Sequence, residues 1–430
     1  MIRPNSTPIL RGLLLLFLTT ITFSLESQQL NLDLSAKSAI LINAQTGAVL
    51  YEKEADEAAF PASITKIATA LYILEKKRDH LRDIVTVSPE SVLSVHASVR
   101  QAANTRHPSY RLEHDGTNMG IRAGDKLPLI DLLYGIMLAS GNDASNAVAY
   151  HLSGGDIPKF VDEMNAFLRE KGLKQTHFSN PHGLHHSEHF TTAHDMALLT
   201  KEGMKNPLFR EIVKTVRYQS RTTPQPLMQH NKLLRAGKYF YPKAIGVKTG
   251  HIARAKFTLV AAAQDGDRTL IAVLLGCPHF EDRFKDAIKL FDAAFKEKRV
   301  NRTLFSSAYD QFSVVLNGAN RPLQAKLSAD LKMTYYPSEE PELKAFVHWN
   351  QKLRLPIKEG DSVGELKLMT KDGQVYQDVP IYATVDVKQT LLSRLAKVFS
   401  LKALFACLLV TGSLFATLHL LKKTKKQKAA

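Results

Sequence analysis

The sequence predicts an α+β protein, in which a domain that combines helices with an antiparallel sheet precedes a small β-rich domain. Three observations support this fold class. Before about residue 300, apolar residues recur at helical spacing in several separate runs. In the same part of the chain, paired apolar runs flank glycine-containing turns and so predict β-hairpins. Beyond residue 300, short alternating segments replace the helical runs, which is typical of a small all-β domain.

The elements of the first domain follow one another along the chain. Hairpins are expected over Ala39–Tyr51 and Phe257–Gly276, and the second turns at Asp265-Gly-Asp267. A capping-box-like spacing at Thr192 predicts the start of a helix. The expected helical runs are Ser63–Glu75, Leu129–Leu138, Asp143–Leu152, Thr192–Leu199 and Arg283–Phe295.

The β-rich domain is expected to begin near residue 300 and to span about 90 residues. Turns such as Lys358-Glu-Gly-Asp361 and Lys371-Asp-Gly373 separate its strands. The expected strands are Phe312–Leu316, Leu353–Ile357, Gly364–Met369 and Val379–Val385.

The net charge is the unusual feature of the composition. Lys and Arg outnumber Asp and Glu by 16 over 430 residues, which suggests nucleic acid or an anionic membrane as a partner. Nine of these basic residues follow Asp386, with no acidic residue among them, and Arg3 and Arg11 lie at the other end. The stretch between carries only +5, so we expect no nucleic-acid partner.

Both charged ends flank apolar runs. Arg3 and Arg11 precede Gly12–Phe23, which is short for a membrane span and matches a secretory signal peptide. An uncleaved N-terminal anchor is the alternative. Ala403–Leu421 is 19 uncharged residues, long enough to cross a bilayer, and the basic run Lys422–Lys426 that follows places this tail in the cytoplasm.

The expected organisation has six segments and places the protein on the outer (periplasmic) face of the cytoplasmic membrane. An interfacial amphipathic helix is the alternative to the span, because leucines and basic residues alternate just upstream. Cys407 lies in the expected anchor, so a disulfide with Cys277 is not expected. The segments are a signal peptide (1–25), the first domain (26–299), the β-rich domain (300–388), an amphipathic lead-in (389–402), a transmembrane anchor (403–421) and a basic tail (422–430).

Ser63-Ile-Thr-Lys66 places a hydroxyl and an amine three residues apart near a helix start, on one face. A serine is a weak nucleophile unless a base lies within hydrogen-bond reach, and a lysine serves when burial lowers its pKa. A helix N-terminus adds N–H groups for a developing oxyanion. Alone, this spacing is common by chance, and a helix cap beside a solvated lysine explains it.

Two further motifs favour catalysis. Ser140-Gly-Asn142 lies between two expected helices and offers a second hydroxyl and an amide. Lys248-Thr-Gly250 leads into a hairpin, so we expect it on an edge strand that can pair with an extended peptide. Its lysine and hydroxyl can hold a carboxylate, and its glycine lets a ligand backbone come close. The three motifs in this order are the signature of penicillin-binding proteins and related β-lactamases.

On these residues the chain resembles the low-molecular-mass penicillin-binding proteins that act as serine-type D-alanyl-D-alanine carboxypeptidases. The resemblance runs from about Ala39 to Phe295 and, more loosely, through the β-rich domain. It implies the transpeptidase fold shared with serine β-lactamases. The matching segments are Pro61-Ala-Ser-Ile-Thr-Lys66, Leu138-Ala-Ser-Gly-Asn-Asp-Ala144, His182-Gly-Leu184 and Gly246-Val-Lys-Thr-Gly-His251.

The resemblance implies a role for each matching residue. The N–H groups of Ser63 and His251 would form the oxyanion hole. The implied catalytic residues are Ser63 as the acylated nucleophile, Lys66 as its general base and Ser140 in proton transfer. The implied substrate-binding residues are Asn142 for the peptide, Lys248 and Thr249 for the terminal carboxylate, and Gly250 and His251 beside them.

The chain departs from this family in three places. One is Ile252–Lys256, where relatives often have a small polar residue at the first position and glycine near the last. Ala97–Thr117 looks like an insertion near the cleft and is rich in Arg, His and Asn. Some relatives place an arginine just after the strand that ends here at Gly276, where this chain has Cys277-Pro278. Arg254 or Arg283 is the candidate substitute.

A competing motif is His185-His-Ser-Glu-His189, which fits the His-x-x-Glu-His pattern of some zinc peptidases. That pattern needs a helix to bring both histidines to one face. Here it follows the turn-rich Asn180-Pro-His-Gly183, so a loop at the rim of the cleft is favoured over a metal site.

We therefore expect a serine-type carboxypeptidase that removes the terminal D-alanine from peptidoglycan stem peptides through an acyl-enzyme on Ser63. β-Lactams are the expected inhibitors, the membrane is the expected anchor surface, and no cofactor or metal is expected. The open alternatives are a D,D-endopeptidase that cuts cross-links and a scaffold that binds peptidoglycan without turnover. A zinc peptidase and a β-lactamase are less favoured.

Overall fold

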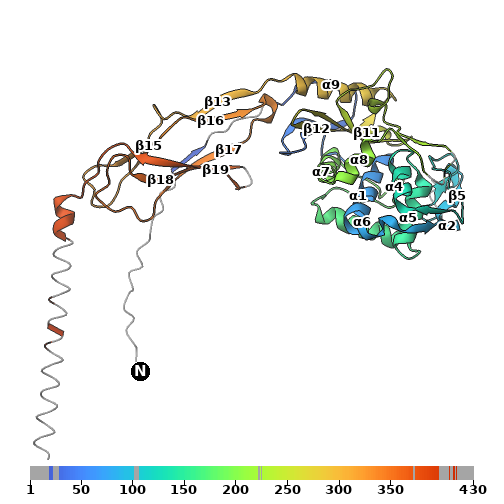
Figure 1. Ribbon diagram of the computed structural model, residues 1–430, viewed down its shortest axis with the longest axis horizontal. Helices are drawn as coiled ribbons and strands as arrows, with labels where there is room; N and C mark the ends of the chain where they lie inside the picture. The colour runs from blue at the N-terminus through green and yellow to red at the C-terminus, as the bar shows by residue number, and fades with distance from the viewer. Residues whose placement is uncertain are drawn as a thin grey trace, which may run out of the picture. The chain divides into compact units, whose positions relative to one another are not determined.

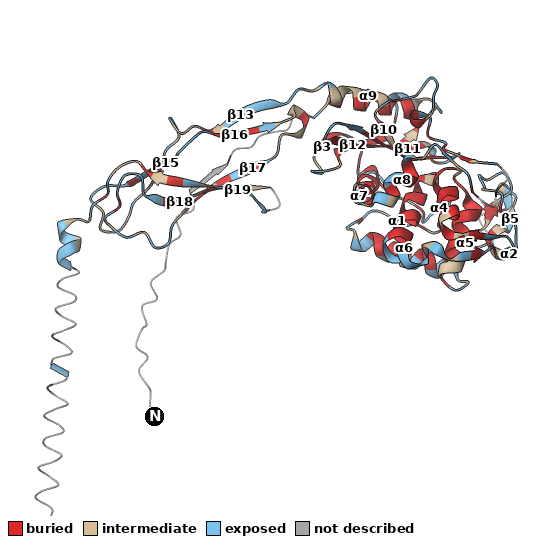
Figure 2. Ribbon diagram, in the orientation of Figure 1, coloured by how far each residue is buried: buried red, intermediate tan, exposed pale blue. Residues whose placement is uncertain are grey.

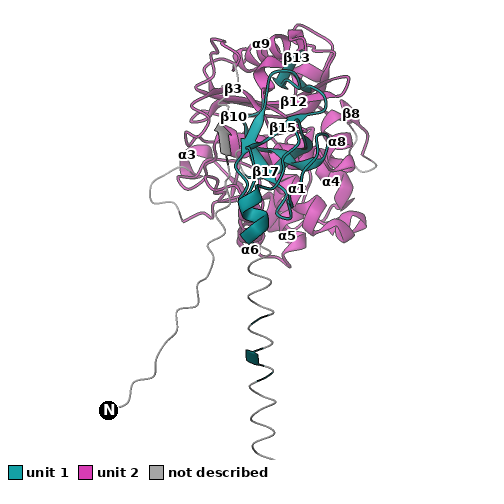
Figure 3. Ribbon diagram, turned by 90° about the vertical axis from the view of Figure 1, so that its left-hand side faces the viewer, with its two compact units in different colours: residues 1–26, 300–335, 341–430 teal, residues 27–299, 336–340 magenta. Residues whose placement is uncertain are grey.

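The computed structural model (Figure 1) describes residues 19–22, 29–100, 106–220, 223, 225–370, 373–396, 406, 410, 411 and 413. The chain folds into two compact units (Figure 3). The α+β unit comprises residues 27–299 together with 336–340. The β-rich unit comprises residues 1–26, 300–335 and 341–430. The short stretch 336–340 therefore belongs to the α+β unit, although it lies within the sequence of the β-rich domain.

A five-stranded antiparallel sheet, ordered β10-β11-β12-β2-β3, is the centre of the α+β unit. Both expected hairpins are present, and β11 and β12 meet across a two-residue turn after Asp265. Strand β10 lies at an edge of the sheet, as its sequence predicted. The strands are β2 (Ser38–Asn43), β3 (Val49–Lys53), β10 (Ala244–Ile252), β11 (Lys256–Asp265) and β12 (Arg268–Cys277).

Both faces of this sheet are buried (Figure 2), because successive side chains of a strand point to opposite sides. On β11, Leu259 and Ala261 belong to a core shared with helix α9 (Asp282–Lys296). Val260 and Ala262 belong to a second, larger core shared with the remaining helices. Because both faces of the sheet are buried, β11 and β12 have nearly continuous apolar sequences.

Within the described residues, helices form at all five of the expected positions, and two further helices of more than one turn, α6 and α8, were not expected. Asp156 and Asn206 cap these two at their N-termini, and each has proline in its first turn. The Thr192 side chain accepts a hydrogen bond from the Asp195 N–H, as its capping spacing predicted. The helices are α1 (Lys66–Lys76), α4 (Leu129–Met137), α5 (Asn142–Leu152), α6 (Ile157–Glu170), α7 (Ala193–Gly203), α8 (Pro207–Lys214) and α9.

Shorter elements connect these parts of the α+β unit. The single-turn helices are η1 (Ala62–Thr65), η2 (Arg78–Arg82), α2 (Pro89–Val92), α3 (Ala97–Arg100), η3 (Lys232–Leu234) and η4 (Pro337–Glu339). The short strand pairs are β4 (Ile84–Thr86) with β7 (Lys126–Pro128), β5 (Ser94–Val95) with β6 (Leu112–Glu113), and β8 (Arg217–Tyr218) with β9 (Leu227–Met228).

The β-rich unit contains a six-stranded sheet, ordered β1-β17-β18-β19-β15-β14, and the pair β13–β16. The expectation of a strand over Leu353–Ile357 is wrong. Only Ile357 pairs there, in an isolated bridge with Val387, and Pro356 has no N–H to donate to a ladder. The strands are β1 (Thr19–Thr22), β13 (Val300–Phe305), β14 (Phe312–Val314), β15 (Leu323–Leu327), β16 (Leu331–Tyr335), β17 (Leu343–Trp349), β18 (Ser362–Thr370) and β19 (Val375–Ala383).

The two expected membrane-targeting segments lie largely outside the described residues. Of residues 1–25, the structure describes Thr19–Thr22, which pair antiparallel with β17. Of residues 403–421, it describes four helical positions. Within the described part of the chain, no helix is both long and apolar enough to cross a membrane.

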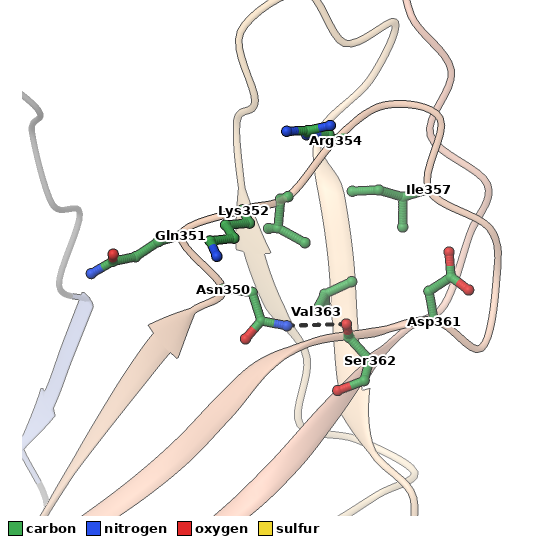
Figure 4. A pocket seen from close by; sticks show the side chains of 9 residues that line it. Asn350, Gln351, Lys352, Arg354, Ile357, Asp361, Ser362 and Val363 are labelled. Carbon is green, nitrogen blue, oxygen red and sulfur yellow. Dashed lines mark hydrogen bonds between the residues drawn. The ribbon is translucent and has the colours of Figure 1, made fainter.

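A pocket of about 690 Å³ opens in the β-rich unit (Figure 4). Its wall carries Lys352, Arg354 and Asp361, and the Asn350 amide donates to the Ser362 carbonyl. The Asp361 carboxylate accepts from the backbone N–H of Lys358 and so closes the turn beneath the pocket. No pair of nucleophile and buried base lines this pocket, which separates it from the site described next.

Candidate active site

Ser63 lies on the 3₁₀ turn η1, immediately before helix α1. Lys66 is the first residue of α1, and its Nζ lies 3.1 Å from Ser63 Oγ. Ala62, which precedes the serine, has φ of +53°, a left-handed conformation that costs a non-glycine residue about 1 kcal/mol or more. The predicted spacing of hydroxyl and amine is therefore confirmed, with the serine on the tighter turn rather than on the α-helix itself.

The Lys66 amine is held by two groups that can only accept hydrogen bonds. Its Nζ donates to Asn142 Oδ1 at 2.7 Å and to the His182 carbonyl at 2.7 Å. Burial, followed by the nearby Lys248 cation, lowers the pKa of Lys66 well below its ordinary value. A neutral amine has two hydrogens and one lone pair. When the two acceptors take both hydrogens of the neutral amine, its lone pair is left for the Ser63 hydroxyl, as a general base requires.

Ser140 and Lys248 form the second half of the site. Lys248 Nζ donates to Ser140 Oγ at 3.0 Å and to the Thr249 carbonyl at 2.9 Å. Burial, and then the Arg283 cation, lowers the pKa of Lys248 to about 7. Ser140 has φ of +60°, so this serine, like the residue before Ser63, is held in a left-handed conformation.

Gly250 lets strand β10 pack against the turn that carries the nucleophile. A Cβ at this position would overlap Thr258 Oγ1 and would lie 2.9 Å from the Ser63 N and 3.0 Å from the Pro61 carbonyl. The sequence assigned this glycine to the approach of a ligand. The structure adds that the protein's own backbone needs the space, because β10 and η1 are in direct contact.

A pocket of about 430 Å³ opens over these residues. Five of the eight predicted site residues line it, and the other three, Lys66, Asn142 and Lys248, are buried and hydrogen-bonded to their neighbours. The lining residues are Ser63, Thr117, Ser140, His230, Lys232, Arg235, Thr249, Gly250, His251, Phe280 and Arg283.

Of the two candidate arginines, Arg283 lines the pocket and Arg254 does not. Arg283 extends from the first turn of α9, and its Nη1 donates to the Gly250 carbonyl at 2.9 Å. Its guanidinium lies 4.7 to 5.1 Å from the ring centres of Phe257, Phe280 and Phe284. The structure therefore places a buried arginine directly behind the Lys248-Thr-Gly250 strand.

His189 supports the nucleophile turn, a role that the sequence did not predict. Its Nδ1 accepts from the Ser179 N–H at 3.0 Å, so its Nε2 carries the hydrogen and donates to Thr65 Oγ1 at 2.8 Å. Thr65 in turn donates to the Ala62 carbonyl at 2.9 Å. Burial lowers the pKa of His189 well below its ordinary value, which keeps this neutral tautomer. The partners are 124 residues apart, and no local signal connects them.

Asp143 holds the residues that directly follow the insertion-like segment against the Ser140-Gly-Asn142 motif. Its carboxylate accepts from the N–H groups of Met119, Gly120 and Ile121 at 2.7 to 3.2 Å. The Asn142 N–H donates to the Thr117 carbonyl, and Thr117 itself lines the pocket. The segment is thus part of the wall of the site.

Arg100 connects the same segment to the loop that holds Lys66. It is 6% exposed, and its guanidinium donates to the carbonyls of His185, Ser109 and Arg111 at 2.6 to 2.8 Å. The sequence flagged this region only as rich in Arg, His and Asn.

The histidine-rich stretch does not have the geometry of the zinc-peptidase motif. Residues 179–190 form no helix, so His185 and His189 are not aligned on one face. Both ring nitrogens of His189 are hydrogen-bonded to protein atoms. Among the described residues, no group of three or more His, Cys, Asp or Glu side chains is arranged to hold a metal ion.

A serine with a buried lysine base, a second serine paired with a second lysine, and an edge strand beside them define a serine acyl-transfer enzyme of the penicillin-binding type. Residues 24–279 match the family described as D-alanyl-D-alanine carboxypeptidase. Residues 311–389 match the C-terminal domain of penicillin-binding protein 5. The chain belongs to the D-alanyl-D-alanine carboxypeptidase family of serine hydrolases, which confirms the resemblance.

Two proteins of similar sequence are both described as D-alanyl-D-alanine carboxypeptidases. The chain is 30% identical to D-alanyl-D-alanine carboxypeptidase DacF of Bacillus subtilis over 387 residues, or 89% of this chain and 94% of that one. It is 34% identical to DacC of Escherichia coli over 298 residues, or 67% of this chain and 69% of that one.

Solved structures show the same fold. Penicillin-binding protein 6B of Escherichia coli superposes with a TM-score of 0.59 at 26% identity, over 84% of this chain and 98% of that one. A DD-transpeptidase of Streptomyces K15 superposes with a TM-score of 0.52 at 32% identity, over 62% of this chain and 99% of that one. The α+β transpeptidase fold and the β-rich C-terminal domain are thus both confirmed.

Proposed function

We propose that this D-alanyl-D-alanine carboxypeptidase removes the terminal D-alanine of peptidoglycan stem peptides through an acyl-enzyme on Ser63. The observation that carries the proposal is the buried Lys66 amine, whose Nζ lies 3.1 Å from Ser63 Oγ and is also held by Asn142 Oδ1 and the His182 carbonyl. The family relationship supports the same reaction class.

Acylation begins when the Ser63 hydroxyl transfers its proton to the Lys66 amine while Oγ bonds to the carbonyl carbon between the two D-alanines. The N–H groups of Ser63 and His251 stabilise the oxyanion. The intermediate collapses as the C–N bond breaks, and the proton that Lys66 took up reaches the leaving nitrogen by way of Ser140, whose Oγ is held by Lys248 Nζ at 3.0 Å. Free D-alanine leaves, and the peptide stays on Ser63 as an ester.

Deacylation reverses the proton path. Water attacks the ester carbonyl, its proton passes to a basic group of the site, and Ser63 Oγ departs with a proton restored. Lys248 and Thr249 bind the terminal carboxylate of the incoming substrate, and Asn142 contacts its peptide. A β-lactam ring amide would be attacked in the same way, but its leaving nitrogen stays tethered, so the acyl-enzyme persists.

Mass spectrometry of the intact protein after reaction with a penicillin tests the proposal. A single adduct on the peptide that contains Ser63, together with D-alanine release from a monomeric pentapeptide, supports it. Release only from cross-linked dimers would identify a D,D-endopeptidase instead. Binding of peptidoglycan with neither adduct nor release would identify a scaffold, and rapid turnover of nitrocefin would identify a β-lactamase.

We also propose that the protein is exported and held at the cytoplasmic membrane by residues 403–421, with the lead-in 389–402 on the outer face. The distribution of basic residues supports this placement. Fractionation of cells that express the full chain, or a chain that ends at Lys388, tests it. The full chain should sediment with membranes and the shortened chain should not.

A further inference from the structure

One residue in the wall of the active-site pocket has an apolar side chain. Among the described residues that line this pocket, the others are glycine or carry a polar or charged side chain. Phe280 is the exception, and it is 41% exposed. A single exposed phenylalanine on a protein surface needs no explanation, but this one lies inside a reactive site. The apolar contact that the pocket offers to a ligand is therefore concentrated at Phe280.

Neighbouring aromatic residues hold the Phe280 ring in place. Its centre lies 5.9 Å from that of Phe257 and 5.5 Å from that of Phe284, and both pairs have the edge-to-face geometry that aromatic rings favour. Phe284 is fully buried, and Phe257 stacks on His251 with ring centres 4.2 Å apart. Because these contacts fix the ring before a ligand arrives, contact with it requires little further ordering of the protein.

Phe280 lies at the end of the pocket where the proposed function places the terminal carboxylate. The guanidinium of Arg283 lies 4.7 Å from the centre of the Phe280 ring. The same guanidinium donates to the carbonyl of Gly250, two residues from Lys248, and so belongs to this end of the pocket. Phe280 therefore borders the subsite of the terminal carboxylate.

The side chain of the leaving residue is the part of the substrate that can reach this ring. It branches from the same Cα as the terminal carboxylate, whereas the retained peptide is proposed to contact Asn142, which is hydrogen-bonded to Lys66. The methyl group of D-alanine covers little of a phenyl ring, and a longer aliphatic chain covers more. Burial of apolar surface is favourable in proportion to the area removed from water.

We propose that Phe280 is a specificity-determining residue that binds the side chain of the leaving D-amino acid. This inference rests on the proposed function, because that function places the leaving residue at this end of the pocket. The substrate class is a peptide that ends in D-alanine followed by a D-amino acid with an aliphatic side chain larger than methyl. A polar side chain of equal size loses water against the ring and gains no hydrogen bond from it.

Three N-acylated peptides that differ only in the last residue test the proposal with the full-length protein. They end in D-Ala-D-Ala, D-Ala-D-Leu and D-Ala-D-Asn, and the last two have side chains of the same branched shape. We expect kcat/KM for the D-Leu peptide to exceed that for the D-Asn peptide about tenfold, mainly through a lower KM. Both side chains are uncharged, so added salt should not reduce the preference.

Phe280→Ala removes the ring and should bring the ratio of D-Leu to D-Asn close to one. Phe280→Leu keeps an apolar surface and should retain most of the preference. The matched control is Phe240→Ala, which removes a ring that is 49% exposed but does not line the pocket, and it should keep the wild-type ratio. Because the ratio compares two substrates of one protein, a general loss of folding or rate does not change it.

The outcomes are distinguishable. Equal kcat/KM for D-Leu and D-Asn in the wild type, or release from D-Ala-D-Ala alone, would overturn the role of Phe280 and leave the proposed function standing. A ratio that survives Phe280→Ala would place the discrimination elsewhere and would also overturn it. No release from any peptide, with no penicillin adduct, would overturn the proposed function itself.

Discussion

The two units of the molecule bury different kinds of side chain. Among the described residues, every buried polar or charged side chain belongs to the α+β unit, and the buried side chains of the β-rich unit are apolar. Burying a lysine costs several kcal/mol unless its surroundings compensate, so a core that tolerates Lys66 and Lys248 is shaped by chemistry as well as stability. Among the described residues, the β-rich core contains no buried charged side chain.

The same contrast separates the two pockets. The pocket of the β-rich unit is the larger of the pair, but its lysine and arginine reach solvent and its carboxylate closes a turn. The pocket of the α+β unit is smaller and lies against two buried lysines. Volume is therefore a poor guide to the reactive site in this protein, and unusual burial of charge is a better one.

The largest effect is expected from Ser63→Ala, which removes the acylated oxygen. D-Alanine release should fall by at least about 10³-fold, and the penicillin adduct should disappear. Ser362→Ala removes a hydroxyl from the wall of the β-rich pocket and is the matched control, which should retain both. If penicillin labelled both variants equally, Ser63 would not be the acylated residue, and the two pockets would not differ in this respect.

Replacement of Lys66 should have the next largest effect. Lys66→Met removes the base, and release should fall by about 10²- to 10⁴-fold in a steady-state assay. Lys66→Arg keeps a cation but cannot give up its proton near neutral pH, so it should be equally impaired. Lys352→Met in the β-rich pocket should leave the rate unchanged. An active Lys66→Arg variant would mean that charge, and not basicity, is what the site needs.

His189→Leu should lower kcat about ten- to a hundredfold with little change in KM, because it breaks the chain from Ser179 to Ala62 that supports the nucleophile turn. His189→Gln retains one acceptor and one donor and should restore much of the loss. If both variants lose only stability, and their rates at low temperature match the wild type, His189 does not position Ser63.

Above pH 7, kcat/KM should decline by up to about tenfold per pH unit, because the free enzyme then loses the Lys248 ammonium that binds the carboxylate. Arg283→Met removes a cation that lowers the pKa of Lys248, so the alkaline decline should move to higher pH. A pH–rate profile measures the pH at which kcat/KM declines separately from its maximal value. An unmoved decline would show that another group titrates there.

The smallest catalytic effect is expected from Leu366→Ala in the β-rich core. Its side chain is fully buried, and the cavity should destabilise that unit by about 2–5 kcal/mol, measured by denaturant unfolding. D-Alanine release at low temperature should not change. Tyr309→Ala, at a position that is 89% exposed, is the control for stability. A large loss of activity in Leu366→Ala would mean that the β-rich core influences the reaction.

The sequence could bring together the residues of the candidate site because they belong to short, local motifs. Ser63 with Lys66, and Lys248 with Gly250, lie within a few residues of each other, so spacing along a helix or a strand places them. Periodicity located the hairpins and the main helices for the same reason. The edge position of β10 followed from its place before a hairpin.

What the sequence could not predict depends on contacts between distant segments. The choice of Arg283 over Arg254 is decided by where α9 packs on the sheet, which no pattern near either residue reveals. His189 meets Thr65 across 124 residues, and its local context resembles an unrelated metal motif. In the β-rich unit, the strands are short and lack strong apolar runs, so the sequence pattern locates them less well. Pro356 has no N–H to donate and prevents the expected strand over Leu353–Ile357.

The stretch 336–340 makes the boundary between the units discontinuous. Glu339 pairs with Arg268, whose side chain is 3% exposed, and Tyr336 stacks on the same guanidinium. Ser338 in turn donates to the Glu297 carboxylate. A chain cut at residue 299 would retain the arginine and lose these neighbours. The second domain therefore cannot be exchanged at a single peptide bond. Residues 336–340 pack on the first unit and would have to be replaced as well.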